Sequence, residues 1–368
     1  MSRGQGAGDG GRGISTTPSP LAPRPSPQRI LVIGPSNIGD AILASGVVSE
    51  VHRRYPAAHL TLVVGERAKA VFADDPRIHT LVDASLFDSP MGRLRLALAL
   101  WRHRPHLLVD LRHTLYPLLL KPLAAWRYLR QPPRSLAHMR DRHLWKLHAQ
   151  VPHFDDRSRF KVQGATEVPL RLSQKDIAHV EQLWKRWRLD GAGRIVIISP
   201  GARSHIKRWT AEGFARVADR LITVAGAQIV FSGEPEEEPI IEEILGLMTQ
   251  RAHSAVGLVT IRQLGVLMRR ARVVIANDSA SLHLASALRI PTVAIFGPTD
   301  ERKYGPTSPR SRTVRRRLFC APCEASLCRF THECMRFISP DEVYEAARQL
   351  LEAGSKKREA GKGRVRDA

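Results

Sequence analysis

Long apolar runs are missing from this 368-residue sequence. No stretch reaches the roughly eighteen consecutive apolar residues from which a membrane-spanning helix is built. The N-terminus also lacks the order of basic, apolar and small residues that marks a secretory signal peptide. These absences argue against an integral membrane protein and against a secreted one, so the sequence predicts a cytoplasmic protein.

Acidic residues are scarce as well. The chain has 35 Asp and Glu against 57 Lys and Arg, a net charge of +22. The excess is concentrated between Arg93 and His148, where twelve basic residues accompany only Asp110 and Asp141, with Trp and Tyr interleaved. Such a segment is either a solvated face or a surface for a polyanion: a nucleic acid, an anionic membrane or a phosphorylated substrate. Charge alone leaves these alternatives open.

Cysteine is absent outside one short segment. The four cysteines are Cys320, Cys323, Cys328 and Cys334, in the spacing C-x2-C-x4-C-x5-C. Four thiolates so close in sequence can close a zinc site, and a disulfide role is also open. Because cytoplasmic thiols are kept reduced, we favour a reduced, packed cluster and expect no metal.

The common glycine-rich phosphate motifs are missing too. A strand at Arg29–Ile33 is followed by the segment GPSNIGD (residues 34–40) and then by a helix to about Tyr55. This loop is not the dinucleotide fingerprint G-x-G-x-x-G, and Asp40 stands where a P-loop requires lysine. An acid in the first turn of a helix also complements the helix dipole, so both a structural and a chemical role are open for Asp40.

A second junction between strand and helix is present late in the chain, at NDSASLHLA (residues 277–285). The run Arg272–Ala276 before it is typical of a buried parallel strand, and apolar residues after it recur at helical spacing up to Pro291. Asp278 and Ser279 suit a helix N-cap, which leaves free backbone N–H groups at the positive end of the dipole. Such a helix start is a phosphate site, although an ordinary capped helix has the same pattern.

Strands alternate with helices along the whole chain, which predicts parallel sheets. In the first half we expect strands near residues 30–33, 60–64, 80–82 and 107–110, helices near 40–55, 66–73 and 91–102, and irregular basic helices to about 148. In the second half we expect strands near 194–199, 228–231, 272–276 and 292–296, and helices near 173–188, 210–224, after 235, after 261, 282–291 and 340–352. Capping boxes at Thr260 and Ser339 begin two of these helices.

The length suits two domains, each with its own core. Composition and pattern divide the chain into a disordered tail (1–28), an N-terminal Rossmann-like domain (29–170), a C-terminal Rossmann-like domain (171–338), a helix (339–354) and a basic disordered tail (355–368). Because one junction of strand and helix falls in each domain, we expect the two to face each other across a cleft.

These segments, in this order, resemble glycosyltransferase family 9, the bacterial lipopolysaccharide heptosyltransferases of the GT-B fold, and lean toward the heptosyltransferase II branch. The matching pieces are IGPSNIGD (33–40), PGA (200–202) with KRW (207–209), NDS (277–279) with His283, FGPTD (296–300) and the cysteine cluster. The resemblance implies an α/β GT-B fold. It also implies an inverting, metal-independent transfer of a sugar, heptose from ADP-heptose, to the lipid A–core acceptor, with no cofactor besides the nucleotide-sugar donor.

The resemblance also implies roles for individual residues. Asp40 matches the proposed general base, which takes the proton of the acceptor hydroxyl. Lys207 faces the diphosphate, where a fixed cation favours the transition state, although a basic surface turn would look the same. Glu237 would bind ribose hydroxyls and Val259 would lie against adenine. The remaining donor-site residues are Gly39, Asp278, Ser279, Ala280, Ser281 and His283, the last more a support for the loop than a chemical group.

Ala280 departs from the family pattern. The family usually has glycine there, and glycine permits a close backbone approach to phosphate. Alanine is tolerated there if its φ is negative. Whether it changes the affinity for the donor, or which donor is bound, is left open.

On the acceptor side the resemblance implies contacts from Ser36, Asn37, Arg112, His113 and Thr114. The basic segment 93–148 would then face a phosphorylated glycolipid and the anionic surface of the inner membrane. This predicts a peripheral protein on the cytoplasmic face of that membrane, and the oligomeric state is left open.

Two other hypotheses for the function compete with a family 9 glycosyltransferase. A nucleic-acid-binding protein would explain the charge, but the sequence has no helix-turn-helix signature, RNP motif or zinc-finger histidine spacing, so no nucleic-acid partner is expected. A GT-B relative acting on another nucleotide sugar, including an epimerase, shares the architecture. An epimerase would require additional carboxylates in the cleft and no lipid acceptor.

Overall fold

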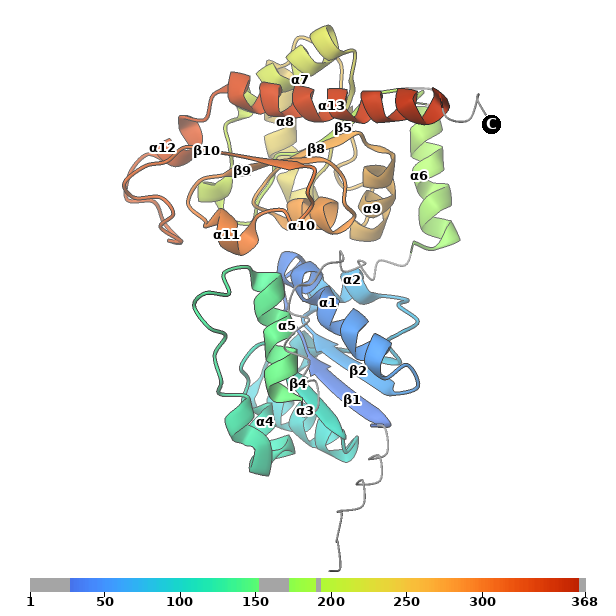
Figure 1. Ribbon diagram of the computed structural model, residues 1–368, viewed down its shortest axis with the longest axis vertical. Helices are drawn as coiled ribbons and strands as arrows, with labels where there is room; N and C mark the ends of the chain where they lie inside the picture. The colour runs from blue at the N-terminus through green and yellow to red at the C-terminus, as the bar shows by residue number, and fades with distance from the viewer. Residues whose placement is uncertain (1–26, 152–171, 190–192, 364–368) are drawn as a thin grey trace, which may run out of the picture.

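The computed structural model describes residues 27–151, 172–189 and 193–363. Its two lobes lie one above the other in Figure 1, and each is built on a parallel sheet with helices around it. The expected α/β architecture of two Rossmann-like domains is confirmed. The predicted tail 1–28 lies almost wholly outside the described residues. The predicted domain boundary at 170/171 also lies outside the described residues, so it stays a prediction.

The N-terminal lobe contains a four-stranded sheet in the order β3-β2-β1-β4. Its strands are β1 (Arg29–Ile33), β2 (His59–Val64), β3 (Thr80–Asp83) and β4 (Leu107–Asp110). After its first residue β1 is buried throughout, because it pairs on both sides in parallel register. The helices are α1 (Ile38–Arg54), α2 (Glu66–Phe72), η1 (Ala84–Phe87), α3 (Pro90–Arg102), α4 (Tyr116–Leu120), η2 (Pro122–Arg127) and α5 (Met139–Gln150).

The C-terminal lobe contains a six-stranded parallel sheet in the order β10-β9-β8-β5-β6-β7. Its strands are β5 (Ile195–Ser199), β6 (Gln228–Phe231), β7 (His253–Ser254), β8 (Val273–Asn277), β9 (Thr292–Phe296) and β10 (Ser311–Arg315). The helices are α6 (Gln174–Arg186), η4 (His205–Lys207), α7 (Ala211–Ala225), η5 (Pro235–Glu237), α8 (Glu238–Leu247), α9 (Ile261–Arg270), α10 (Ala280–Ala287), α11 (Glu301–Tyr304), α12 (Glu333–Arg336) and α13 (Pro340–Gly363).

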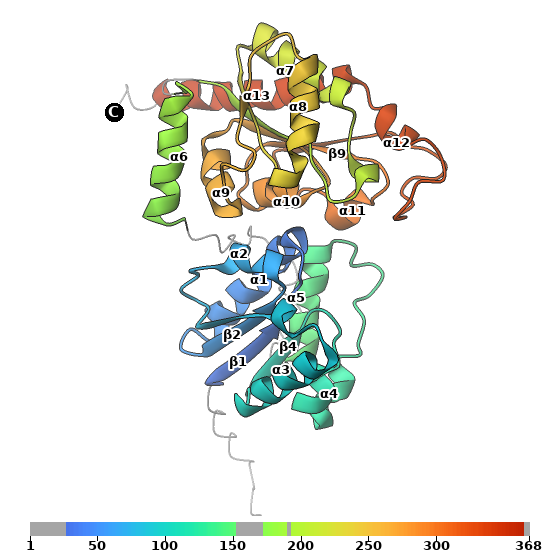
Figure 2. The same cartoon turned by 180° about the vertical axis from the view of Figure 1, so that it is seen from behind.

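The predicted elements agree closely with these bounds, with a few differences in the C-terminal lobe. Both capping boxes form, since the Thr260 side chain accepts from Gln263 N and the Ser339 side chain accepts from Glu342 N at 3.2 Å. The edge strands β7 and β10 were not predicted, because neither is an apolar run. α13 lies across the lobe beside α7 (Figures 1 and 2) and continues to Gly363. The disordered tail expected from residue 355 is therefore wrong up to Gly363, where Lys, Arg, Glu and Ala favour a helix.

The lobes are joined by packing and by polar contacts. The starts of α1 and α10 pack together, and one cluster of buried apolar residues continues from Ile30 in β1 to Ala285 in α10. On the other side, Arg262 of α9 donates to the Ala73 carbonyl at 3.0 Å and to Asp176 Oδ2 at 2.6 Å. Within the described residues, no helix is both long and apolar enough to cross a bilayer.

Candidate active site between the two lobes

A cavity of about 870 Å³ lies between the lobes. Binding sites for small molecules typically measure about 300–1,000 Å³, so this one has room for a nucleotide sugar. The starts of α1 and α2 line it from one lobe, and the loops after β5, β6 and β8 line it from the other. Of the residues predicted from sequence, those that line it are Asn37, Gly39, Asp40, Lys207, Glu237, Val259, Asp278, Ser279, Ala280, Ser281 and His283.

The first turn of α1 brings Asp40 to the cavity. Asn37 is the N-cap residue, and its amide group donates to Asp40 Oδ2 at 3.3 Å and accepts from Arg203 of the other lobe. Gly39 permits the close approach of the two helices, since a Cβ there would lie 2.9 Å from Cδ2 of His283. Asp40 is therefore a partly buried carboxylate at the seam between the lobes.

Lys207 faces the same cavity from η4. Its Nζ donates to Asp278 Oδ2 at 2.7 Å and lies 5.9 Å from the centre of the Tyr304 ring. The Asp278 side chain is 4% exposed and that of Lys207 30%. Because an ammonium group has three N–H donors, the pairing with Asp278 fixes the cation and leaves further donors for a ligand.

The start of α10 provides backbone donors beside this pair. Ser279 is the N-cap residue, but its side chain makes no capping hydrogen bond, and its Oγ is buried without a partner. The N–H groups of the first helical turn, at Ala280 and Ser281, have no acceptor within the helix. Ala280 has a right-handed helical backbone, so this position does not require glycine.

His283 lies one turn further along α10 and is 7% exposed. Its Nε2 is 3.7 Å from Asp278 Oδ1. Burial lowers the pKa of His283, although the nearby carboxylates of Asp278 and Asp40 oppose this shift. A neutral imidazole in contact with Asp278 and Gly39 is suited to positioning the loop rather than to proton transfer.

The loop after β6 carries Glu237. Its carboxylate accepts a hydrogen bond from Glu234 N at 3.0 Å. Gly201 is needed opposite, since a Cβ at that position would lie 2.0 Å from the Glu237 carboxyl carbon. Burial raises the pKa of Glu237. This close contact explains why position 201 in the loop after β5 is glycine.

Asn277 ties the loops after β5 and β8 together. Its Nδ2 donates to the Pro200 carbonyl at 2.6 Å, and its Oδ1 accepts from Trp209 N at 3.3 Å. The buried Trp209 ring donates from Nε1 to the Ile338 carbonyl at 3.1 Å. These contacts set the position of Lys207, and the KRW motif is thus an anchor as well as a charge.

Several residues of the cavity were missed by the sequence analysis. Arg67 of α2 lines it and pairs with Glu234 across the lobes, and the lining residue Tyr304 has its ring centre 5.9 Å from Lys207 Nζ. Arg67 lies in the first turn of α2, three residues after the end of β2, and this junction of strand and helix is a usable sequence signal. Arg203, Ser204 and His205 directly follow the PGA motif at residues 200–202, whereas Ser326 and Leu327 reach the cavity from a segment with no such signal.

The predicted acceptor contacts are less well supported. Ser36 packs on Gly65 and does not line the cavity. Arg112, His113 and Thr114 do not line it either. Their turn is held by Asp110, which accepts from Arg112 N at 2.9 Å and from Thr114 N at 2.6 Å. An acceptor role for them stays a prediction.

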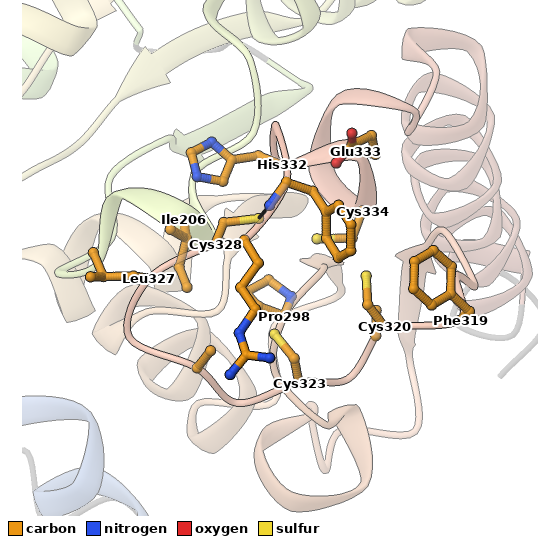
Figure 3. A pocket seen from close by; sticks show the side chains of 14 residues that line it. Ile206, Pro298, Phe319, Cys320, Cys323, Leu327, Cys328, His332, Glu333 and Cys334 are labelled. Carbon is orange, nitrogen blue, oxygen red and sulfur yellow. Dashed lines mark hydrogen bonds between the residues drawn. The ribbon is translucent and has the colours of Figure 1, made fainter.

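The four cysteines line a second cavity of about 440 Å³, shown in Figure 3. All four are free thiols. Burial, and after it the thiols of Cys328, Cys320 and Cys323, raises the pKa of Cys334 to about 11. Across residues 27–151, 172–189 and 193–363, no group of three or more His, Cys, Asp or Glu side chains has metal-binding geometry as it stands.

The glycosyltransferase family 9 (heptosyltransferase) model matches residues 131–333, more than half of the chain. A lipooligosaccharide heptosyltransferase 2 of Campylobacter jejuni is 25% identical over 88% of this chain and 98% of its own. The E. coli ADP-heptose lps heptosyltransferase II has a similar fold, with a TM-score of 0.69, 21% identity and coverage of 89% and 99%. A more distant fold neighbour is the iron-containing dodecameric glycosyltransferase TibC of E. coli, with a TM-score of 0.54, 14% identity and coverage of 89% and 77%. The chain belongs to glycosyltransferase family 9, and it is a glycosyltransferase of the GT-B fold.

Proposed function

We propose that this enzyme transfers heptose from ADP-heptose to the core of lipopolysaccharide, with inversion at the anomeric carbon and without a catalytic metal. The observation that carries the proposal is the shared cavity, in which Asp40 of one lobe faces Lys207, Asp278 and the start of α10 of the other. The relatives named as heptosyltransferases give the sugar and the acceptor.

The chemistry needs a base and an anion site on opposite sides of the sugar. Asp40 takes the proton from the acceptor hydroxyl, whose oxygen attacks the anomeric carbon. The bond from that carbon to the diphosphate breaks, and ADP leaves with the electron pair. Lys207, the free N–H groups of α10 and Ser279 Oγ meet the growing negative charge. They fill the role that a divalent cation has in other sugar-nucleotide enzymes.

Donor binding is the direct test. ADP and ADP-heptose should raise the melting temperature in the presence of EDTA, because a ligand that binds only the native state stabilises it. UDP-N-acetylglucosamine is the control for a different nucleotide sugar. Mass spectrometry should then find one heptose added to a heptose-deficient core acceptor. Strict dependence on magnesium, or protection by UDP-sugars alone, would contradict the proposal.

We also propose that the acceptor reaches the enzyme at a membrane surface. The described residues leave many large apolar side chains exposed on η1, α3, α4, η2 and the adjoining turns. Figures 1 and 2 show α3 and α4 on the part of the N-terminal lobe away from the C-terminal lobe. We call this the apolar face: Leu86, Met91, Leu94, Leu98, Trp101, Leu115, Leu118, Leu119, Leu123, Trp126 and Leu129. Arg93, Arg95, Arg127 and Arg130 lie among them in sequence.

An apolar face with cations among its residues is suited to the headgroup and acyl boundary of an anionic bilayer, not to water. Vesicles of phosphatidylglycerol and phosphatidylethanolamine should co-sediment with the protein. Changing Leu115, Leu123 and Leu129 together to Ser should weaken binding roughly hundredfold, at about 1 kcal/mol for each partly buried side chain.

The matched control removes exposed apolar side chains from the C-terminal lobe, with Val224 and Leu247 changed to Ser. It should bind vesicles like the wild type. An oligonucleotide assay on the same proteins distinguishes the nucleic-acid alternative. Strong nucleic-acid binding that vesicles fail to displace would contradict the membrane assignment.

A further inference from the structure

Asn37 stands at the N-cap of α1 but does not cap the helix. Asparagine is favoured at this position because its side-chain oxygen accepts a hydrogen bond from a backbone N–H of the first turn. Here the side chain makes no capping hydrogen bond. Its oxygen instead accepts from Nη1 of Arg203, and its nitrogen donates to Asp40 Oδ2 at 3.3 Å. The amide therefore links a cation of the C-terminal lobe to the carboxylate that we assign as the base.

The chemistry of the three groups fixes the direction of this link. A guanidinium group only donates hydrogen bonds, so the oxygen of the Asn37 amide has to face Arg203. The NH₂ group then faces Asp40, and an ionised carboxylate only accepts. A hydrogen bond to the amide oxygen also polarises the amide and strengthens the bond that its nitrogen donates. The positive charge of Arg203 thus acts on Asp40 through Asn37.

Both ends of the link rest on tightly packed backbone. On the side of α1, a Cβ at Gly39 would lie 2.9 Å from Cδ2 of His283, so the start of α1 is fixed against α10. On the other side Ala202 is buried, and its carbonyl accepts from Arg208 Nε at 2.9 Å. Arg203 follows directly in the chain, so the packing of the two lobes sets the distance that its side chain has to span.

We propose that Arg203 and Asn37 are positioning residues that orient the carboxylate of Asp40 toward the acceptor hydroxyl. The inference rests on the proposed function, in which Asp40 is the general base. In the part of the chain that the structure describes, the bond from Asn37 is the only hydrogen bond to the Asp40 carboxylate, and it uses Oδ2. Oδ1 is left for the acceptor hydroxyl. Because a base has to lie within hydrogen-bond reach of the proton it takes, a fixed orientation favours the transfer.

The link also depends on the arrangement of the lobes. Arg203 and Asn37 are 166 positions apart and belong to different lobes, so their contact exists only while the lobes are together. When the cleft is open, the Asn37 amide loses the group that sets its direction and can turn its oxygen toward the N–H groups of α1. The base is therefore oriented only where the donor lobe and the acceptor lobe meet.

Arg203→Met tests the first half of the link. Although Arg203 belongs to the C-terminal lobe, its loss should act as a change at the base does. We expect kcat to fall roughly ten- to hundredfold, because misplacing a reacting group by a small distance can cost about 10²-fold, while ADP should protect the variant as it protects the wild type. Arg203→Lys should recover part of the loss, since it keeps a cation that donates. Arg216→Met, on an exposed arginine of α7, is the matched control and should leave kcat unchanged.

Asn37→Asp tests the second half. The carboxylate keeps the shape of the side chain and still accepts from Arg203, but it cannot donate to Asp40 and places a like charge beside it. We expect kcat to fall at least as far as in Arg203→Met, again with protection by ADP unchanged.

The decisive measurement combines Arg203→Met with Asp40→Asn. A residue that acts only through the base has nothing left to act on once the base is gone, so the two losses should not add. In single-turnover assays Arg203→Met should slow the Asp40→Asn enzyme by less than about twofold. A merely structural role would give the same factor in both backgrounds.

Other results would overturn the inference. Loss of protection by ADP in Arg203→Met would make Arg203 a donor contact, and a higher acceptor KM at unchanged kcat would make it an acceptor contact. Equal factors in the wild-type and Asp40→Asn backgrounds would make its role structural. The proposed function fails on a different result, since an Asp40→Asn enzyme with nearly full activity removes the base itself. If Asp40→Asn loses activity and Arg203→Met does not, only the inference fails.

Discussion

The two lobes share one plan but differ in what they expose. In the part of the chain that the structure describes, the C-terminal lobe has seven exposed large apolar side chains, and three of them lie between β10 and α12. The N-terminal lobe has eleven, all between Leu86 and Leu129. Both lobes bury the same kind of apolar strands, so the fold alone does not account for the different numbers of exposed apolar side chains. We therefore relate this difference to the function proposed for each lobe. We propose that the N-terminal lobe uses its exposed apolar side chains to meet a membrane surface, and that the C-terminal lobe binds the nucleotide-sugar donor.

The lobes also bring different charges to the cleft. At its seam the N-terminal lobe presents the carboxylate of Asp40, and the C-terminal lobe presents Lys207 and the start of α10. A carboxylate suits the neutral hydroxyl of an acceptor, whereas a cation and free N–H groups suit a diphosphate. Substitutions in the two lobes should therefore change different kinetic constants.

The largest effect is expected from Asp40→Asn in the N-terminal lobe. The amide keeps the shape and the hydrogen bond from Asn37 but cannot accept a proton at neutral pH. Because general base catalysis contributes about 10²–10⁴-fold, kcat should fall by that factor with ADP affinity unchanged. Asp88→Asn, on an exposed residue of the same lobe, is the control. A variant with nearly full activity would remove Asp40 from the mechanism.

Lys207→Met tests the other side of the cleft. Here both the donor KM and kcat should change, since in the proposed mechanism the ammonium group contacts the donor before and during bond breaking. Loss of one fixed donor to a developing anion costs about 10²–10³-fold in kcat. It also leaves Asp278, 4% exposed, without its cation. Steady-state kinetics with varied ADP-heptose measures both constants, and Lys185→Met on the exposed side of α6 is the control. An unchanged donor KM would contradict the prediction that the C-terminal lobe binds the donor through Lys207.

Much of the fold could be predicted because its signals are local. Apolar runs such as Ile195–Ser199 and the capping box at Thr260 need no knowledge of distant residues. β10 escaped prediction because Ser-Arg-Thr-Val-Arg is polar, and it forms only where β9 offers an edge. Asp40 and Asp278 could be found because each sits at a junction of strand and helix.

The rest of the site depends on contacts distant in sequence. The pairing of Lys207 with Asp278 joins residues 71 positions apart, and Arg67 meets Glu234 across 167 positions. The apolar face was also invisible to the sequence analysis. α3 has apolar residues that could equally have faced the core, and only the fold decides that Leu94 and Leu98 are exposed while Leu96 and Leu100 are buried.

The third prediction concerns the cations near the apolar face. Replacing Arg127, Arg130 and Arg134 by Ala should raise the apparent acceptor KM and leave donor affinity unchanged. The guanidinium groups of Arg127 and Arg130 lie 5.4 and 5.8 Å from the rings of Trp126 and Trp145. Each basic group near an anionic surface is worth about 1 kcal/mol, so the three together give up to about a hundredfold.

Salt sharpens this test. Exposed charges are screened over about 8–10 Å near physiological ionic strength, so the difference between variant and wild type should shrink as salt rises. The control removes three exposed arginines from the C-terminal lobe, Arg251, Arg269 and Arg312. If both triple variants raise the acceptor KM equally, net charge is responsible and the contrast between the lobes fails.

The smallest effect is expected in acid stability. Burial, with help from Lys146 and Arg142, lowers the pKa of His143 from 6.5 to about 3, and both ring nitrogens lack a partner. A group whose folded pKa is depressed stabilises the fold above its unfolded pKa. That stability is lost as the pH falls from 6.5 toward 3.

One such group makes the free energy of unfolding fall by about 2 kcal/mol between about pH 6.5 and 5. Denaturant titration should show this loss in the wild type and about 2 kcal/mol less of it in His143→Leu, with His103→Gln on an exposed turn as the control. Lys146 adds nothing in this window, because its pKa of about 8 keeps it protonated in both states. Burial also lowers the pKa of His283, so this residue adds to the loss of stability at acid pH. The effect of His143 is therefore the difference in pH dependence between wild type and His143→Leu, not the whole pH dependence of the wild type. Identical slopes would mean that water reaches its ring, and the N-terminal core would then be more open than its packing implies.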